Sequence, residues 1–129
     1  MFILKSIYCR AYQLTFRAIL PLLPYREPEI VGSCSELCSV FAKENVKSAL
    51  IVTGKGSANN RRIAPVEDAL NKSGVSYAIF SGVQPNPTIE NVEEGVKLYR
   101  ENNCDCIIAF GGGSAIDCAK VIGARIAYP

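Results

Sequence analysis

Residues 106–120 read CIIAFGGGSAIDCAK, a short apolar run followed by three glycines, a serine and a helix-like pattern. Ile116, Ala119 and Ile122 fall on one face at helical spacing, so the stretch predicts a strand, a glycine turn and a helix. Glycines let the backbone approach a ligand closely and adopt a positive φ. The helix that follows directs its unpaired N–H groups and the positive end of its dipole at the turn. A phosphate or pyrophosphate is the expected occupant.

The same residues also have a purely structural interpretation. Ser114 and Asp117 have the spacing of a capping box, with serine as the N-cap and an acid at N3. Glycines in a strand-to-helix turn can serve tight packing alone. Because short glycine motifs also occur by chance, the turn by itself does not decide between a ligand site and a cap.

Composition narrows the classes of function. The chain has 129 residues, 49% of them hydrophobic, which suffices for one domain with a core. Its net charge is +2 without a long basic run, so no nucleic-acid partner is expected. Histidine is absent, which removes the commonest metal ligand and the commonest general base near neutral pH. No apolar run approaches the roughly 20 residues of a membrane span, so none is expected.

The six cysteines do not have the spacing of a metal site. No Cys-x-x-Cys pair occurs, so the usual zinc and redox spacings are missing. Cys104 and Cys106 are expected to point to the same side of a strand, and two thiols without further ligands hold a metal poorly. We therefore expect no metal on this chain, and reduced thiols in a cytoplasmic protein.

Residues 1–27 are expected to form a leader with one helix. Six apolar side chains recur at helical spacing: Ile7, Tyr8, Ala11, Leu14, Ala18 and Ile19. They predict a helix that ends before Pro21. We expect it to pack on a neighbouring domain or subunit, because the basic residues are too few to favour a membrane surface.

Residues 28–129 predict an α/β domain. A short edge strand is expected at residues 28–31, and the strands that follow at 48–53, 75–80 and 106–110 alternate with helices. This order is typical of a Rossmann-like parallel sheet with helices on both faces. Ligands of such sheets lie beyond the carboxyl ends of the strands.

Three loops should meet at that edge of the sheet. They span residues 54–57, 81–87 and 111–114, and the second holds Asn86 between two prolines that fix φ. Two glycine turns and a rigid asparagine at one edge favour a nucleotide site over a simple helix cap.

Three segments stand in a recognisable order: LIVTGKG at residues 50–56, GVQPNPTIENVEEG at 82–95 and FGGGSAIDCAK at 110–120. Together they resemble the iron-containing (group III) alcohol dehydrogenases, over residues 28–128. The PNPT loop paired with the GGGSxxDxxK turn is specific. Residues 8–13 and 23–30 also resemble the start of one subgroup of these enzymes.

The resemblance implies two domains, a dinucleotide-binding α/β domain followed by an all-helical domain that carries iron or zinc. It implies that Gly112, Gly113 and Ser114 hold the pyrophosphate of the cofactor. Asn86 would contact the cofactor from the second loop, and Asp117 would lie near the nicotinamide and the substrate.

Position 54 bears on the choice of cofactor. Many family members have an aspartate there, which binds the adenosine ribose and repels a 2′-phosphate. Here it is Gly54, followed by Lys55, whose ammonium could pair with a phosphate. We expect NADP to be accepted as well as NAD, and to be preferred if Lys55 contacts the phosphate.

The metal site is the part of the family pattern that this sequence lacks. The resemblance places an aspartate and histidines in the second domain, whereas this chain has no histidine and ends at Pro129. Hydride transfer to an aldehyde needs an electrophile on the carbonyl oxygen, which the metal supplies. We therefore expect a truncated α/β domain, the amino-terminal part of a metal-dependent alcohol dehydrogenase acting on a small alcohol or aldehyde. It would be inactive alone, and no residue is assigned a catalytic role.

Other classes stay open. The chain could be a non-catalytic module that binds a nucleotide, or one that docks on a full-length enzyme through an exposed sheet edge. It could also be a gene remnant that never folds stably. A polyol dehydrogenase or a dehydroquinate synthase is a close variant, although residues 114–117 argue against the synthase. A homo-oligomer is compatible with each of these classes.

Overall fold

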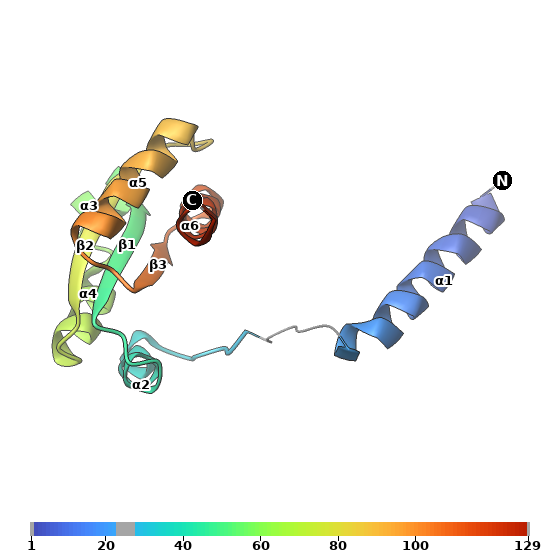
Figure 1. The fold of residues 1–129 in the computed structure, drawn as a ribbon, viewed down its shortest axis with the longest axis horizontal. Helices are drawn as coiled ribbons and strands as arrows, with labels where there is room; N and C mark the ends of the chain where they lie inside the picture. The colour runs from blue at the N-terminus through green and yellow to red at the C-terminus, as the bar shows by residue number, and fades with distance from the viewer. Residues whose placement is uncertain (1, 23–27, 129) are drawn as a thin grey trace. The chain divides into compact units, whose positions relative to one another are not determined.

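The computed structural model describes residues 2–22 and 28–128. The chain divides into two compact units, Met1–Ile30 and Val31–Pro129 (Figure 1). Residues 23–27, which belong to the expected leader and to one of the resembling segments, lie outside the described residues, as do Met1 and Pro129.

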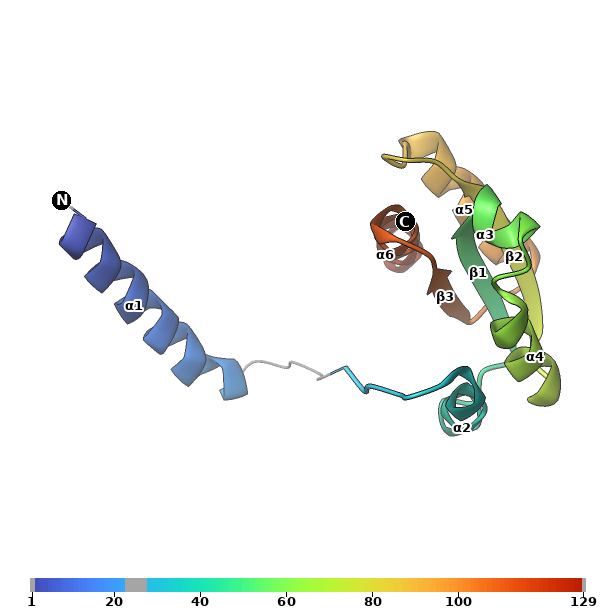
Figure 2. The same ribbon diagram turned by 180° about the vertical axis from the view of Figure 1, so that it is seen from behind.

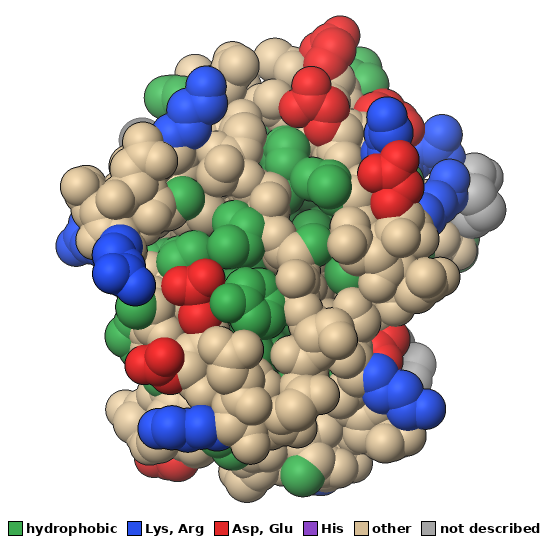
Figure 3. All heavy atoms as spheres, turned by 90° about the vertical axis from the view of Figure 1, so that its left-hand side faces the viewer, with side chains coloured by type: hydrophobic (Ala, Val, Ile, Leu, Met, Phe, Trp, Pro, Cys, Tyr) green, Lys and Arg blue, Asp and Glu red, His purple; other side chains and the backbone are tan. Residues whose placement is uncertain are grey.

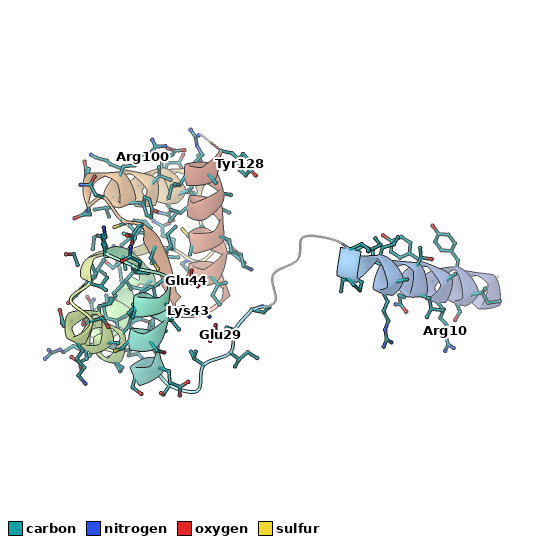
Figure 4. All side chains as sticks on the ribbon, turned by 60° about the horizontal axis from the view of Figure 1, so that its bottom comes forward. Arg10, Glu29, Lys43, Glu44, Arg100 and Tyr128 are labelled. Atoms are coloured by element: carbon teal, nitrogen blue, oxygen red, sulfur yellow. The ribbon has the colours of Figure 1, made fainter. Side chains whose placement is uncertain are left out.

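The first unit contains helix α1 (Phe2–Ile19), followed by the 3-10 helix η1 (Leu20–Leu22). α1 ends just before Pro21, whose ring removes a backbone donor. Its described side chains are exposed, among them Tyr12 and Phe16, which stack with ring centroids 6.2 Å apart. Figure 4 shows Arg10 extending outward from this helix. Among the described residues, no helix is both long and apolar enough to cross a membrane.

The second unit is built on a parallel sheet. Its described strands are β1 (Ser48–Gly54), β2 (Ser76–Val83) and β3 (Cys106–Phe110), in the order β2-β1-β3. The first six residues of the central strand β1 are buried, as its continuous apolar run predicts. The edge strand expected at residues 28–31 is wrong: these residues form no strand, because no described strand pairs with them.

Helices cover both faces of the sheet, which confirms the predicted fold class (Figures 1 and 2). On one face, Leu50 and Val52 of β1 pack with α5 (Ile89–Glu101) and α6 (Gly113–Ala127). On the other, Ala49 and Ile51 pack with α2 (Leu37–Lys43), which continues the 3-10 helix η2 (Cys34–Glu36), and with α4 (Ala64–Lys72). Alternate residues of one strand thus supply two separate cores.

α5 and α6 pack against each other on their face of the sheet, with their axes crossing (Figure 1). Figure 4 shows Arg100 near the end of α5 and Tyr128 after α6 at the same end of the unit. Thr88 caps α5 as predicted, since its hydroxyl accepts the N–H of Asn91 at 3.4 Å.

Four of the described helices end in the same way, in a Schellman motif. A residue with positive φ follows the helix, and the next N–H donates to the carbonyl five residues earlier. These positive-φ residues are Asn45 after α2, Arg61 after the short helix α3 (Lys55–Asn59), Gly74 after α4 and Asn103 after α5. Asparagine and glycine tolerate this conformation, whereas arginine has no such preference.

Two of the expected loops are shorter than predicted. α3 begins at Lys55, directly after β1, so residues 54–57 are not an open turn. β2 extends to Val83, because Gly54 pairs irregularly with both Gly82 and Val83 and prolongs the ladder. The second loop therefore starts at Gln84.

Asp105 joins the start of β3 to the start of β1. Its carboxylate accepts the N–H of Lys47 at 3.0 Å and that of Ser48 at 3.2 Å. Because β3 begins only after Asp105, strand alternation does not reach Cys104. The expected common direction of the two thiols is wrong: Cys104 lies in the core of α5 and α6, and Cys106 packs on the opposite face.

Candidate functional site

The glycine turn lies between β3 and α6. Gly111 has φ +141, which only glycine adopts readily, and a Cβ there would stand 3.3 Å from that of Ala115. Gly112 is the N-cap of α6, and its carbonyl accepts the N–H groups of Ala115 and Ile116 at 3.1 and 3.3 Å. The positive φ thus explains the glycine at position 111, whereas Gly112 serves as the N-cap of α6.

The capping box predicted at Ser114 is wrong. α6 starts at Gly113, so Ser114 lies inside the first turn and no side chain caps the helix. Asp117, one turn further on, pairs instead with Lys120 at 3.4 Å on the exposed surface. Both side chains are thereby left without the purely structural role that their spacing indicated.

Gly112 and Gly113 face open space. Apart from the adjacent residues and the backbone of α6 itself, no described atom lies within 4 Å of the position that a Cβ would occupy at either residue. Gly112 has φ −85 and ψ −170, extended values that other residues adopt, and Gly113 is helical. Neither backbone strain nor crowding accounts for these two glycines. A group that approaches the first N–H groups of α6 would account for both.

A cleft of about 390 Å³ lies over the turn. The ends of β1 and β2, helix α3 with the residues after it, and the glycine turn all contribute to its lining. Three segments thus meet at the carboxyl edge of the sheet, where a parallel sheet binds ligands. Of the residues singled out from the sequence, Gly54, Gly112, Gly113 and Ser114 line the cleft.

The other three sequence candidates lie elsewhere. Lys55 is exposed at the start of α3, and Asn86, with φ +58, is exposed in the loop after β2. Neither lines the cleft. Asp117 borders a second, mostly apolar cleft of about 190 Å³, together with Thr88 of the α5 cap and Val121 of α6.

Sequence reasoning missed Arg62, Asn60 and Gln84, which all line the glycine cleft. Arg62 carries the only charge among the described residues of the lining. The signal for it was the basic pair at residues 61 and 62, but its position depends on how early α3 ends. Asn60 is the C-cap of that short helix.

Buried thiols supply no reactive group beside the cleft. Burial raises the pKa of Cys118. Burial also raises the pKa of Cys104, although the hydrogen bond from Ser48 acts in the opposite direction. Burial followed by the nearby Asp105 carboxylate raises the pKa of Cys106. A raised pKa leaves a thiol protonated and weakly nucleophilic near neutral pH.

The arrangement at the glycine turn is suited to binding an anion.

The sheet, its covering helices and the glycine turn define a Rossmann-like α/β protein. Residues 30–129 match the family described as iron-containing alcohol dehydrogenase, and the chain belongs to that family.

Curated relatives support this assignment. NADH-dependent butanol dehydrogenase A of Clostridium acetobutylicum is 46% identical over 80 residues, which is 61% of this chain and 21% of the relative. The 1,3-propanediol dehydrogenase of Klebsiella pneumoniae is 34% identical over 110 residues, or 84% of this chain and 28% of the relative. This chain therefore spans about a quarter of the length of such relatives.

Solved structures share the fold. The crystal structure of a 1,3-propanediol oxidoreductase aligns with a TM-score of 0.71 and 35% identity, over 74% of this chain and 25% of that one. An alcohol dehydrogenase from Oenococcus oeni aligns with a TM-score of 0.67 and 38% identity, also over 74% of this chain and 25% of the other.

The two groups that the family implies fit this chain differently. A dinucleotide fits the cleft, because Gly112 and Gly113 leave open space at the start of α6. The iron does not fit the described residues, which contain no group of three or more His, Cys, Asp or Glu side chains able to hold a metal. Histidine is also missing from the full sequence.

Proposed function

We propose that this chain is the amino-terminal, dinucleotide-binding part of a metal-dependent alcohol dehydrogenase. Residues 28–129 would form a partial dinucleotide-binding domain, and residues 1–27 a leader. The observation that carries the proposal is the open space at Gly112 and Gly113, beside a cleft without a carboxylate in its described lining. A pyrophosphate at the start of α6 would use the unpaired N–H groups and the helix dipole.

Six of the seven sequence candidates keep a role in this proposal. Gly112, Gly113 and Ser114 would hold the pyrophosphate. Gly54 leaves the ribose end of the cleft without a negative charge, so a 2′-phosphate would not be repelled and NADP would bind as well as NAD.

The remaining candidates would act outside the glycine cleft. Asp117 and Asn86 would contact the nicotinamide half of the cofactor, because Asp117 lies one helical turn beyond the pyrophosphate position. Lys55, exposed at the start of α3, lies outside the lining of the cleft and is assigned no contact with the cofactor.

A small alcohol or its aldehyde is the proposed substrate of the complete enzyme. The relatives carry names such as butanol and 1,3-propanediol dehydrogenase, which supports a short-chain alcohol. We propose that this chain alone is inactive, because its own residues offer no set of ligands for iron or zinc. A cytoplasmic location agrees with the free cysteines, and the edge strand β2 offers a surface for association with copies of this chain.

Calorimetric titration of the 129-residue chain with NADP and with NAD tests the binding proposal. We expect saturable heat with both cofactors. Gly113→Ala should weaken binding about tenfold or more, since its methyl group would occupy the ligand space. Gly123→Ala is the matched control on the same helix, outside the cleft, and should change affinity less than about threefold.

Three outcomes would each contradict a part of the proposal. A chain that is folded by circular dichroism but gives no saturable heat would rule out a cofactor site. NAD binding that is about tenfold tighter than NADP binding would rule out the cofactor preference alone. Alcohol turnover by the isolated chain, after addition of iron(II) or zinc and butanol, would contradict its proposed inactivity.

A docking module is the second candidate, supported by the exposed edge of β2. Figure 3 shows hydrophobic side chains gathered on the β2 side of the sheet, with charged side chains around them. Ile79 of β2 is 37% exposed. A partner strand could extend such an edge. Light scattering of the chain over a range of concentrations would detect self-association through it.

A further inference from the structure

The turn after α3 brings one arginine to the glycine cleft. Arg61 has φ +53, and its N–H donates to the carbonyl of Ala58 at 3.2 Å. The N–H of Arg62 donates to the carbonyl of Ser57 at 3.1 Å, which completes the Schellman motif. These bonds fix the backbone at Arg62. Its side chain then lines the glycine cleft and an adjoining hollow beside Phe110.

Within the part of the chain that the structure describes, the guanidinium of Arg62 has no counter-charge. No ion pair or side-chain hydrogen bond involves it within residues 2–22 and 28–128, and no carboxylate is among the described residues that line the cleft. By contrast, Arg125 of α6 pairs with Glu93 at 3.0 Å. An unpaired guanidinium beside open space is a ready binding group for an anion.

Lys55 lacks this placement. It is the first residue of α3 and does not line the cleft. Arg62 is therefore the cation that a bound cofactor would meet. The hydroxyl of Ser57 and the amide of Asn60 line the same side of the cleft and can donate further hydrogen bonds.

We propose that Arg62, and not Lys55, binds the 2′-phosphate of NADP and sets the preference for that cofactor; this rests on the proposed dinucleotide site. The start of α6 provides N–H groups for the pyrophosphate, which leaves the guanidinium for a separate phosphate. A phosphate monoester is doubly charged near neutral pH and matches the bidentate fork of arginine. Gly54, on the same side, adds no repelling carboxylate.

Four variants of the full chain, titrated with NADP and with NAD, test this role. Arg62→Gln should weaken NADP binding by about tenfold or more, while NAD binding changes less than about threefold. Arg62→Lys keeps the charge but loses the fork, so its NADP affinity should fall between those of the wild type and Arg62→Gln. Arg61→Gln removes the same charge from the adjacent exposed residue, and Lys55→Gln removes the alternative cation. Both should match the wild type within about threefold.

The outcomes separate this inference from the proposed function. Equal losses of NADP and NAD in Arg62→Gln would overturn it, because the arginine would then contact the pyrophosphate. An unchanged Arg62→Gln, or a selective loss of NADP in Lys55→Gln, would overturn it as well. A wild type that binds NAD but not NADP would leave the dinucleotide site standing and refute the role of Arg62. A wild type that binds neither cofactor would refute both. Thermal unfolding of each variant checks that the fold is intact.

Discussion

Gly95 of α5 lies directly against Ile122 of α6. A methyl group at Gly95 would overlap Cδ1 of Ile122 and stand 3.0 Å from its Cγ1. Ile122 is completely buried, so its side chain has little room to turn away. The close approach of these two helices depends on the missing side chain at this one glycine.

Gly95→Ala should destabilise the chain by about 1–2 kcal/mol, measured as the free energy of unfolding in urea. Overpacking would outweigh the gain of roughly 1 kcal/mol that alanine brings to a helix. Gly123→Ala is the matched control, because a Cβ there meets only Ile107 Cδ1 at the ordinary distance of 3.7 Å. It should leave stability unchanged or raise it.

Shortening the partner should relieve the clash. Ile122→Val removes the Cδ1 atom, so the double variant with Gly95→Ala should lose less stability than the two single changes added together. A Gly95→Ala chain as stable as the wild type would show that the helices move apart freely.

Arg61→Gly should stabilise the chain. Arginine in a left-handed conformation costs about 1 kcal/mol that glycine avoids, and the Schellman bonds to Ala58 and Ser57 do not use the side chain. The midpoint of urea unfolding should rise without a change of slope. Asn103→Gly, at the equivalent position after α5, is the comparison and should gain clearly less, because asparagine already tolerates a φ of +48. A loss of stability in Arg61→Gly would contradict this account.

Asp105→Ala should lower the free energy of unfolding by about 1–2 kcal/mol. The carboxylate accepts two backbone N–H groups at the start of β1, from Lys47 at 3.0 Å and Ser48 at 3.2 Å. Both bonds are lost in alanine, whereas Asp105→Asn keeps one carbonyl acceptor and should lie between alanine and the wild type. Asp68→Ala, at an exposed position of α4, serves as a surface control. Equal stabilities for the Asp105 and Asp68 variants would show that the link between the strands contributes nothing.

Stability should fall as the pH rises above about 9. Burial raises the pKa values of Cys104, Cys106 and Cys118 above the ordinary 9.0. Above that pH the unfolded chain releases these protons first, so the folded state holds more protons and loses stability with each further rise in pH. Below pH 9 these thiols are protonated in both states and their contribution is constant.

Unfolding in urea at several values between pH 7 and 10.5 would measure this decline. Cys118→Ala should make the slope shallower, whatever its effect on stability at pH 7, because one buried thiol no longer titrates. The pKa of Tyr77 is also raised above 10.0, first by burial and then by Glu67, so the decline should continue at the upper end of the range. A constant free energy up to pH 10.5 would refute the assignment.

Much of the fold was predictable because its signals are local. The buried run of β1 and the apolar spacing of α5 lie within single elements, and asparagine or glycine marks the ends of α2, α4 and α5. The glycines at the start of α6 were found for the same reason. Their chemistry follows from three adjacent residues and the helix after them.

Features that depend on distant contacts or on element length were missed. The start of β3 is set by bonds from Asp105 to residues more than 50 positions earlier, so the directions of Cys104 and Cys106 could not be inferred from alternation. Arg62 reaches the cleft only because α3 ends after five residues, at Asn59, and because an arginine takes the left-handed position. Arginine has no preference for the left-handed conformation, so the sequence does not indicate a turn at this position.

The four Schellman motifs lie at opposite edges of the sheet, and the residues that occupy them differ between the two edges. Those after α2, α4 and α5 lead directly into the three strands and so lie at the amino edge, where asparagine or glycine occupies the strained position. The motif after α3 alone lies at the carboxyl edge, next to the cleft, and there an arginine occupies it. The residues that end the helices before each strand are thus separated by the length of a strand from those that line the cleft. Under the role proposed for Arg62, substitutions in the α3 turn would alter cofactor choice while leaving the assembly of the sheet untouched.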